Sequence, residues 1–152
     1  MKSLVALIVG FIPLPIGYGI HLFLTFYDNN TNLSKPLDLI SIIFFLLWGL
    51  LGFLLCRFTK TKTHAFVICH IPAFIVLTLI LFQELINKKY WGNIWGFATQ
   101  FFYMPTIRIS FIVQPNFMHY MWQTYIISFV LMLIVFYLGG LIRDKIYPSK
   151  KL

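Results

Sequence analysis

The sequence is poor in acidic residues and in charge generally. Only four of its 152 residues are Asp or Glu, and charged residues make up 11%, against about 25% in ordinary soluble domains. Hydrophobic residues reach 60%, so too few polar side chains remain to cover a compact body in water. These deficits exclude an ordinary soluble domain. They predict an all-α integral membrane protein that forms a single membrane domain over residues 1–152.

The chain also lacks the short motifs of common enzyme and metal sites. No G-x-S-x-G, H-E-x-x-H or phosphate-binding loop occurs, and Cys56 and Cys69 do not form a C-x-x-C pair. The four-helix disulfide-forming membrane oxidoreductases need such a pair. The small multidrug transporters carry a glutamate in the middle of their first span, where this chain has prolines and glycines. The sequence therefore resembles neither family, and we expect no metal and no cofactor.

Basic residues outnumber acidic residues by twelve to four, which gives a net charge of +8. They sit at the ends of apolar runs and form neither a helical stripe nor a nucleic-acid-binding motif, so no nucleic-acid partner is expected. Lys and Arg residues that flank apolar runs are typical of the loops that orient membrane spans. The expected partners are membrane lipid and other membrane proteins, or further copies of the chain.

Four apolar runs are long enough to cross a bilayer as helices, which takes about 20 residues. They cover about residues 4–27, 37–58, 65–87 and 122–142. Pro13 and Pro15 should kink the first run. Small residues recur on single helical faces and predict close contact between helices; they include Gly10, Gly17, Gly49, Gly52 and Gly139.

The segment between the third and fourth runs, about residues 90–120, is unusually aromatic. Aromatic residues at this density suit the headgroup layer of a membrane, so we predict one or two short helices that lie on the surface or dip into it. An alternative fifth span over residues 94–113 would carry Pro105 and Arg108 through lipid, and a central arginine costs about 2.5–3.5 kcal/mol. The sequence thus favours a four-transmembrane-helix bundle with an aromatic interfacial segment.

The distribution of basic residues predicts the orientation of this bundle. Four spans place both termini on one side of the membrane. That side holds eight of the twelve basic residues: Lys2, Arg57, Lys60, Lys62, Arg143, Lys145, Lys150 and Lys151. Because cytoplasmic loops carry the excess of Lys and Arg, we expect a multi-pass protein of the plasma membrane with a cytoplasmic N-terminus and a cytoplasmic C-terminus.

Two ionisable residues lie within the third run. Helical steps of three and four residues connect His70 to Glu84, so both should occupy one face. A charged residue inside a span is costly and marks a functional site. Together with His21 in the first run, they form a candidate intramembrane polar site. The structural alternatives are a neutral His21 bonded to a neighbouring helix and an ion pair between Glu84 and Lys88.

Three functions follow from these residues. We expect first an accessory or structural membrane protein that contacts other membrane proteins or lipid. The alternative is a small oligomeric transporter or channel in which His21, His70 and Glu84 exchange protons along a polar path. The second alternative is a membrane enzyme at the outer interface. There Arg108 and His119 would form an outer-face site, with His119 as base, Arg108 as anion clamp and Glu84 as acid.

Overall fold

The structure is a computed structural model that describes residues 2–26, 34–58, 62–114 and 120–147. In these ranges the regular elements are all helices. Four helical stretches are long and apolar enough to cross a membrane: Ser3–Phe26, Lys35–Cys56, Thr63–Ile86 and Met121–Ile146. They coincide closely with the four predicted apolar runs, which confirms this part of the prediction.

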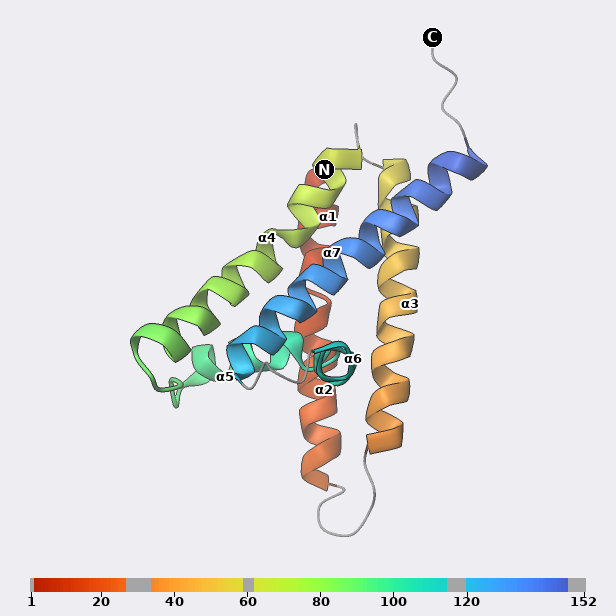
Figure 1. The fold of residues 1–152 in the computed structure, drawn as a ribbon. Coiled ribbons are helices and arrows are strands. Elements are labelled where there is room, and N and C mark those ends of the chain that lie inside the picture. Colours follow the sequence, from red (N-terminus) through yellow and green to blue (C-terminus); the bar gives the residue numbers. More distant parts are fainter. Residues whose placement is uncertain (1, 27–33, 59–61, 115–119, 148–152) are drawn as a thin grey trace.

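The first stretch is divided in two, as its prolines predict. Helix α1 (Lys2–Gly10) ends in a turn at Phe11 and Ile12, and α2 (Pro13–Phe26) follows in nearly the same direction (Figure 1). In the turn, the backbone N–H groups of Phe11 and Ile12 each donate to a carbonyl three residues earlier at 3.0 Å. This tighter turn accommodates Pro13, which has no N–H to donate.

The most extensive helix contact joins α3 (Ser34–Phe58) to α7 (Met121–Ile146). Helix α3 stands beside α2, and α7 crosses α3 obliquely (Figure 1). The backbones approach closely because Gly52 lies against the backbone of Phe136 and Gly139 against that of Gly49. The buried Trp48 side chain adds a hydrogen bond from Nε1 to the Met132 carbonyl at 3.2 Å. The predicted glycine faces are therefore confirmed, and they are used within the chain.

Helix α4 (Lys62–Leu81) packs against α1 and α7. Gly10 of α1 contacts the Cys69 backbone, and Cys69 itself is fully buried, as expected of a free cysteine. The helix continues past the buried Pro72 and then widens into one π-turn, η1 (Phe82–Ile86). In this turn the Asn87 N–H donates to the Phe82 carbonyl at 3.1 Å, which spans five residues.

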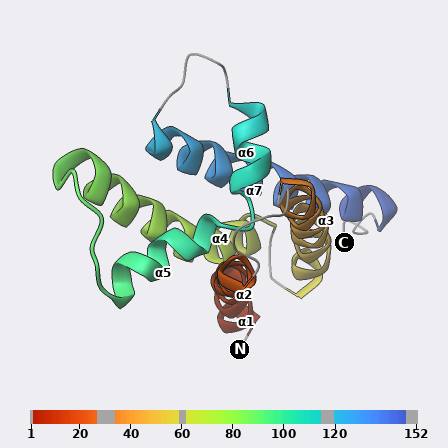
Figure 2. The same ribbon diagram turned by 90° about the horizontal axis from the view of Figure 1, so that it is seen from below.

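The aromatic segment forms two short helices, α5 (Ile94–Tyr103) and α6 (Ile107–Val113), joined by a turn at residues 104–106. Figure 2 shows α5 running from the far end of α4 back to the centre of the molecule, where α6 sets off in a new direction. Gly17 of α2 lies against the Phe101 backbone of α5. Ten helical residues extend only about 15 Å, so residues 94–113 do not form one continuous helix that could cross a membrane as the alternative fifth span. The position of these helices relative to a membrane surface stays a prediction.

Helix α1 begins and α7 ends at the same end of the bundle (Figure 1). The turns at the other end join α4 to α5. This arrangement is the one required of a chain that crosses a layer an even number of times.

Candidate functional site

His70 lies in the core of the bundle and is only 4% exposed. The rings of Trp48, Phe66 and Phe136 surround it, with centroids at 5.8, 4.9 and 5.0 Å. Nδ1 donates to the Phe66 carbonyl at 2.8 Å, while Nε2 is buried without a hydrogen-bond partner among the described residues. An imidazole enclosed by three aromatic rings is held by packing, away from water.

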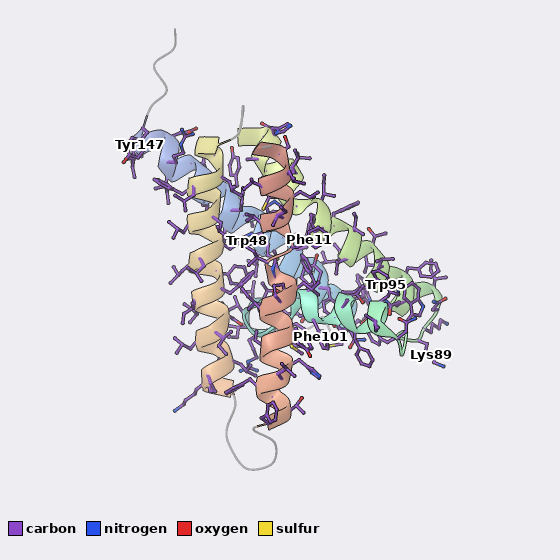
Figure 3. All side chains as sticks on the ribbon, turned by 180° about the vertical axis from the view of Figure 1, so that it is seen from behind. Phe11, Trp48, Lys89, Trp95, Phe101 and Tyr147 are labelled. Carbon is purple, nitrogen blue, oxygen red and sulfur yellow. The ribbon has the colours of Figure 1, made fainter. Side chains whose placement is uncertain are left out.

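His21 lies on α2, on the face that meets α5. Its ring stacks on Phe101 of α5, which is labelled in Figure 3, with the centroids 4.6 Å apart. It lines a groove of about 560 Å³ between α2 and α5, together with Tyr18, Phe97, Ala98 and other apolar residues. We call this the α2–α5 groove. Gly17 of α2 lies against the Phe101 backbone, so Gly17 and His21 both face α5.

Glu84 lies in the π-turn at the end of α4. Its carboxyl group faces the start of α7, where the backbone amide of Trp122 interacts with it. Its Oε1 atom is buried without a hydrogen-bond partner among the described residues. The ion pair expected between Glu84 and Lys88, both of them described, is not formed. A π-turn changes the spacing that brings residues four apart together, and Lys88 leaves the helix with φ at 51°.

The structure does not assemble the three residues of the predicted intramembrane site. His21 faces α5, His70 is enclosed in the core, and Glu84 lies at the far end of α4. No hydrogen bond or ring contact joins any two of these described side chains. The single face shared by His70 and Glu84 follows the helix only as far as Leu81, where the π-turn begins.

Arg108 is engaged by Asp38, a partner seventy positions away in the sequence. Arg108 Nε donates to Asp38 Oδ1 at 2.8 Å, and about a third of each side chain, 34%, is exposed. This ion pair joins α6 to the first turns of α3. His119, the other residue of the predicted outer-face site, lies outside the described residues.

Sequence reasoning missed a set of internal polar contacts. The fully buried Gln83 donates from Nε2 to Thr99 Oγ1 at 3.2 Å, and its Oε1 accepts from the Trp91 N–H at 3.0 Å. The hydroxyls of Ser110 and Ser128 lie 2.7 Å apart. Small polar residues within apolar runs are the signal that could have indicated these contacts.

Tyr103 makes a further internal contact. Its hydroxyl donates to the Ala73 carbonyl at 2.7 Å, which ties α5 to α4. Burial raises the pKa of the Tyr103 hydroxyl well above its usual value. The hydroxyl therefore stays protonated and available as a donor, and it acts in packing.

Charged groups gather at one cleft, where α4 ends and α7 begins. This cleft, of about 670 Å³, is lined by Glu84, Lys88, Lys89, Tyr90, Tyr120 and Trp122 among others; we call it the Glu84 cleft. The Tyr90 hydroxyl, like Glu84 Oε1, is buried without a hydrogen-bond partner in the described part of the chain. Sequence reasoning placed Tyr90 in the aromatic segment and did not connect it to Glu84.

Comparison of the chain with protein-family models, with curated proteins and with solved structures gives no match. Within residues 2–26, 34–58, 62–114 and 120–147, no three His, Cys, Asp or Glu side chains are grouped to hold a metal ion.

Proposed function

We propose that this protein is a multi-pass protein of the plasma membrane, with both termini cytoplasmic, that serves as an accessory or structural component. It acts by binding other membrane proteins or lipid through its outer surface. Four long apolar helices and the shared end of the first and last helices support the membrane topology. The excess of basic residues at that end supports the orientation.

The observation that carries this proposal is that three pairs of polar side chains join neighbouring helices within the chain. Gln83 bonds to Thr99, Ser110 to Ser128, and Thr124 Oγ1 to Gln114 Oε1 at 2.7 Å. In lipid such pairs hold helices together, because a lone polar group would be costly. A body closed in this way supports binding through its exterior more than passage through its interior.

Among the described residues, the α2–α5 groove, of about 560 Å³, is larger than a second apolar groove of about 350 Å³ between α3 and α7. The described lining of the α2–α5 groove is almost wholly apolar. Three residues of this lining, Tyr18, Ile94 and Phe97, are about half exposed or more. Since the glycine faces of α1, α2, α3 and α7 are occupied by helices of the same chain, this groove is the surface we assign to a partner. An apolar helix of another membrane protein matches its chemistry.

The test is co-purification of the full chain in mild detergent, after crosslinking in cells. The variant Ala98→Trp fills the α2–α5 groove, and Leu47→Trp adds bulk on an exposed face of α3 that lines no groove in the described part of the chain. We expect a discrete crosslinked partner with the wild type and with Leu47→Trp, and its loss with Ala98→Trp. A chain that always purifies alone, or two variants that behave alike, would contradict the proposal.

A further inference from the structure

We propose that the Glu84 cleft binds a phosphoethanolamine group, the headgroup of an amine-bearing phospholipid. The cleft combines two cationic side chains, one carboxyl group and an unpartnered phenol hydroxyl in a space of about 670 Å³. This inference uses only the membrane location from the proposed function, and it is independent of the α2–α5 groove and its partner.

The amine end of the ligand is matched by Glu84 and Tyr90. Glu84 Oε1 and the Tyr90 hydroxyl are both buried, and neither has a hydrogen-bond partner among the described residues. A primary ammonium carries three N–H donors, so it can satisfy a carboxylate oxygen and a phenol oxygen at the same time. Hydrogen bonds between charged groups are about twice as strong as neutral ones.

The phosphate end is matched by Lys88 and Lys89, which line the same cleft and are exposed. Lysine binds phosphate as a point charge and needs no fixed geometry. Lys88 holds a left-handed backbone conformation, with φ at 51°, which costs a non-glycine residue about 1–2 kcal/mol. Such strain is found at functional sites more often than elsewhere.

The remaining lining suits the border between headgroups and acyl chains. Tyr120 and Trp122 supply aromatic rings, and Leu85 and Met121 supply apolar side chains. Aromatic faces attract an ammonium group, and Trp and Tyr are enriched at membrane interfaces. Figure 3 shows the labelled Lys89 at the tip of the molecule where α4 turns toward α5, at the end of the third long apolar helix.

The charge pattern favours this group over other headgroups. A purely anionic headgroup would meet the carboxyl group of Glu84, and a purely cationic ligand would meet two lysines. A choline headgroup carries both charges but has no N–H donor. It would leave Glu84 Oε1 and the Tyr90 hydroxyl without partners.

The test measures which lipid stays bound to the full-length protein. The protein is extracted from vesicles containing equal amounts of phosphatidylethanolamine, phosphatidylcholine and phosphatidylglycerol, and retained lipid is identified by native mass spectrometry. We expect phosphatidylethanolamine to be preferred over phosphatidylcholine about tenfold, the effect of one charged hydrogen bond. Equal retention of the two lipids would overturn the proposal.

Two conservative variants assign the preference to the cleft. Glu84→Gln and Tyr90→Phe should each reduce the preference for phosphatidylethanolamine several-fold. Asp144→Asn and Tyr137→Phe, which lie outside the cleft, should leave this preference unchanged.

Because the Tyr90 hydroxyl has no described partner, Tyr90→Phe should melt at the wild-type temperature in lipid-free detergent. Tyr90→Phe therefore keeps the test decisive if Glu84→Gln fails to fold. An unchanged preference in Tyr90→Phe, or in both variants, would sink the idea.

A third arm separates the two sources of this chemistry. Free phosphoethanolamine is added to the lipid-free protein in detergent, and the melting temperature is followed. A rise that Tyr90→Phe abolishes supports a soluble ligand, and a rise seen only with the lipid supports a membrane ligand. Failure of the crosslinking experiment on Ala98→Trp would count against the proposed function and leave this result intact.

Discussion

At the scale of single residues, the neighbours Gln83 and Glu84 have opposite environments. Gln83 is fully buried, and its side chain both donates and accepts hydrogen bonds. Glu84 keeps a buried oxygen without a partner among the described residues. Because both residues belong to the same π-turn, the turn directs one side chain into the protein and the other to the Glu84 cleft. We therefore assign a structural role to Gln83 and a binding role to Glu84.

The structural role of Gln83 predicts a loss of stability in Gln83→Leu. The substitution would leave the Trp91 N–H without its acceptor, and a buried group without a partner costs about 1–3 kcal/mol. Gln100→Leu, on α5 and only partly buried, is the matched control. Thermal unfolding in detergent should show a lower midpoint for Gln83→Leu alone, and equal midpoints would contradict the role.

The left-handed conformation of Lys88 predicts that a glycine at this position makes the protein more stable. Lys88→Gly should raise the free energy of unfolding by about 1 kcal/mol, because glycine adopts φ at 51° without strain. Lys89→Gly has no such strain to relieve and should bring no gain. The same unfolding assay compares the two, and a more stable Lys89→Gly would show that the strain does not matter. Lys88→Gly should also weaken phosphoethanolamine binding.

At the scale of helices, glycines determine how closely α3 and α7 approach. A Cβ atom added at Gly52 would collide with the backbone of Phe136, and one at Gly139 with the backbone of Gly49. Backbone cannot move aside as a flexible side chain can. The contact between α3 and α7 therefore depends on these positions more than on the surrounding leucines.

This dependence predicts that Gly52→Ala and Gly139→Ala each destabilise the protein by about 1–3 kcal/mol, the usual cost of overpacking. Gly19→Ala is the control, since a Cβ there meets no atom within 4 Å. It should be neutral or should stabilise α2 by up to about 1 kcal/mol, because alanine favours helix. Unfolding midpoints in detergent measure all three, and a destabilised control with unchanged Gly52→Ala would refute the packing argument.

At the scale of the whole molecule, much of the surface is apolar. Large hydrophobic side chains such as Leu46, Ile94 and Trp95 are 70% or more exposed. Exposing this surface to water would cost about 25 cal/mol of free energy per Å² of apolar area. This exposed apolar surface favours a lipid environment, which is the basis of the proposed membrane location.

This location predicts the behaviour of the chain in cell fractionation. The protein should stay in the membrane pellet after an alkaline carbonate wash, and reporter fusions at its two ends should both be active on the cytoplasmic side. The even number of crossings and the basic residues near both ends are the reasons. Recovery in the supernatant would contradict the membrane location, and reporters on opposite sides would contradict the four-span topology alone.

What the sequence by itself determined is the set of long helices and their inward faces. Their limits follow from run length, the break in the first from Pro13, and the contact positions of Gly52 and Gly139 from helical periodicity. These properties are local, so they can be read along the chain. The tertiary structure alone decided which polar groups meet, because Arg108 and Asp38 are seventy positions apart. It also supplied the π-turn, which breaks the periodicity that predicted a Glu84–Lys88 pair and creates the cleft instead.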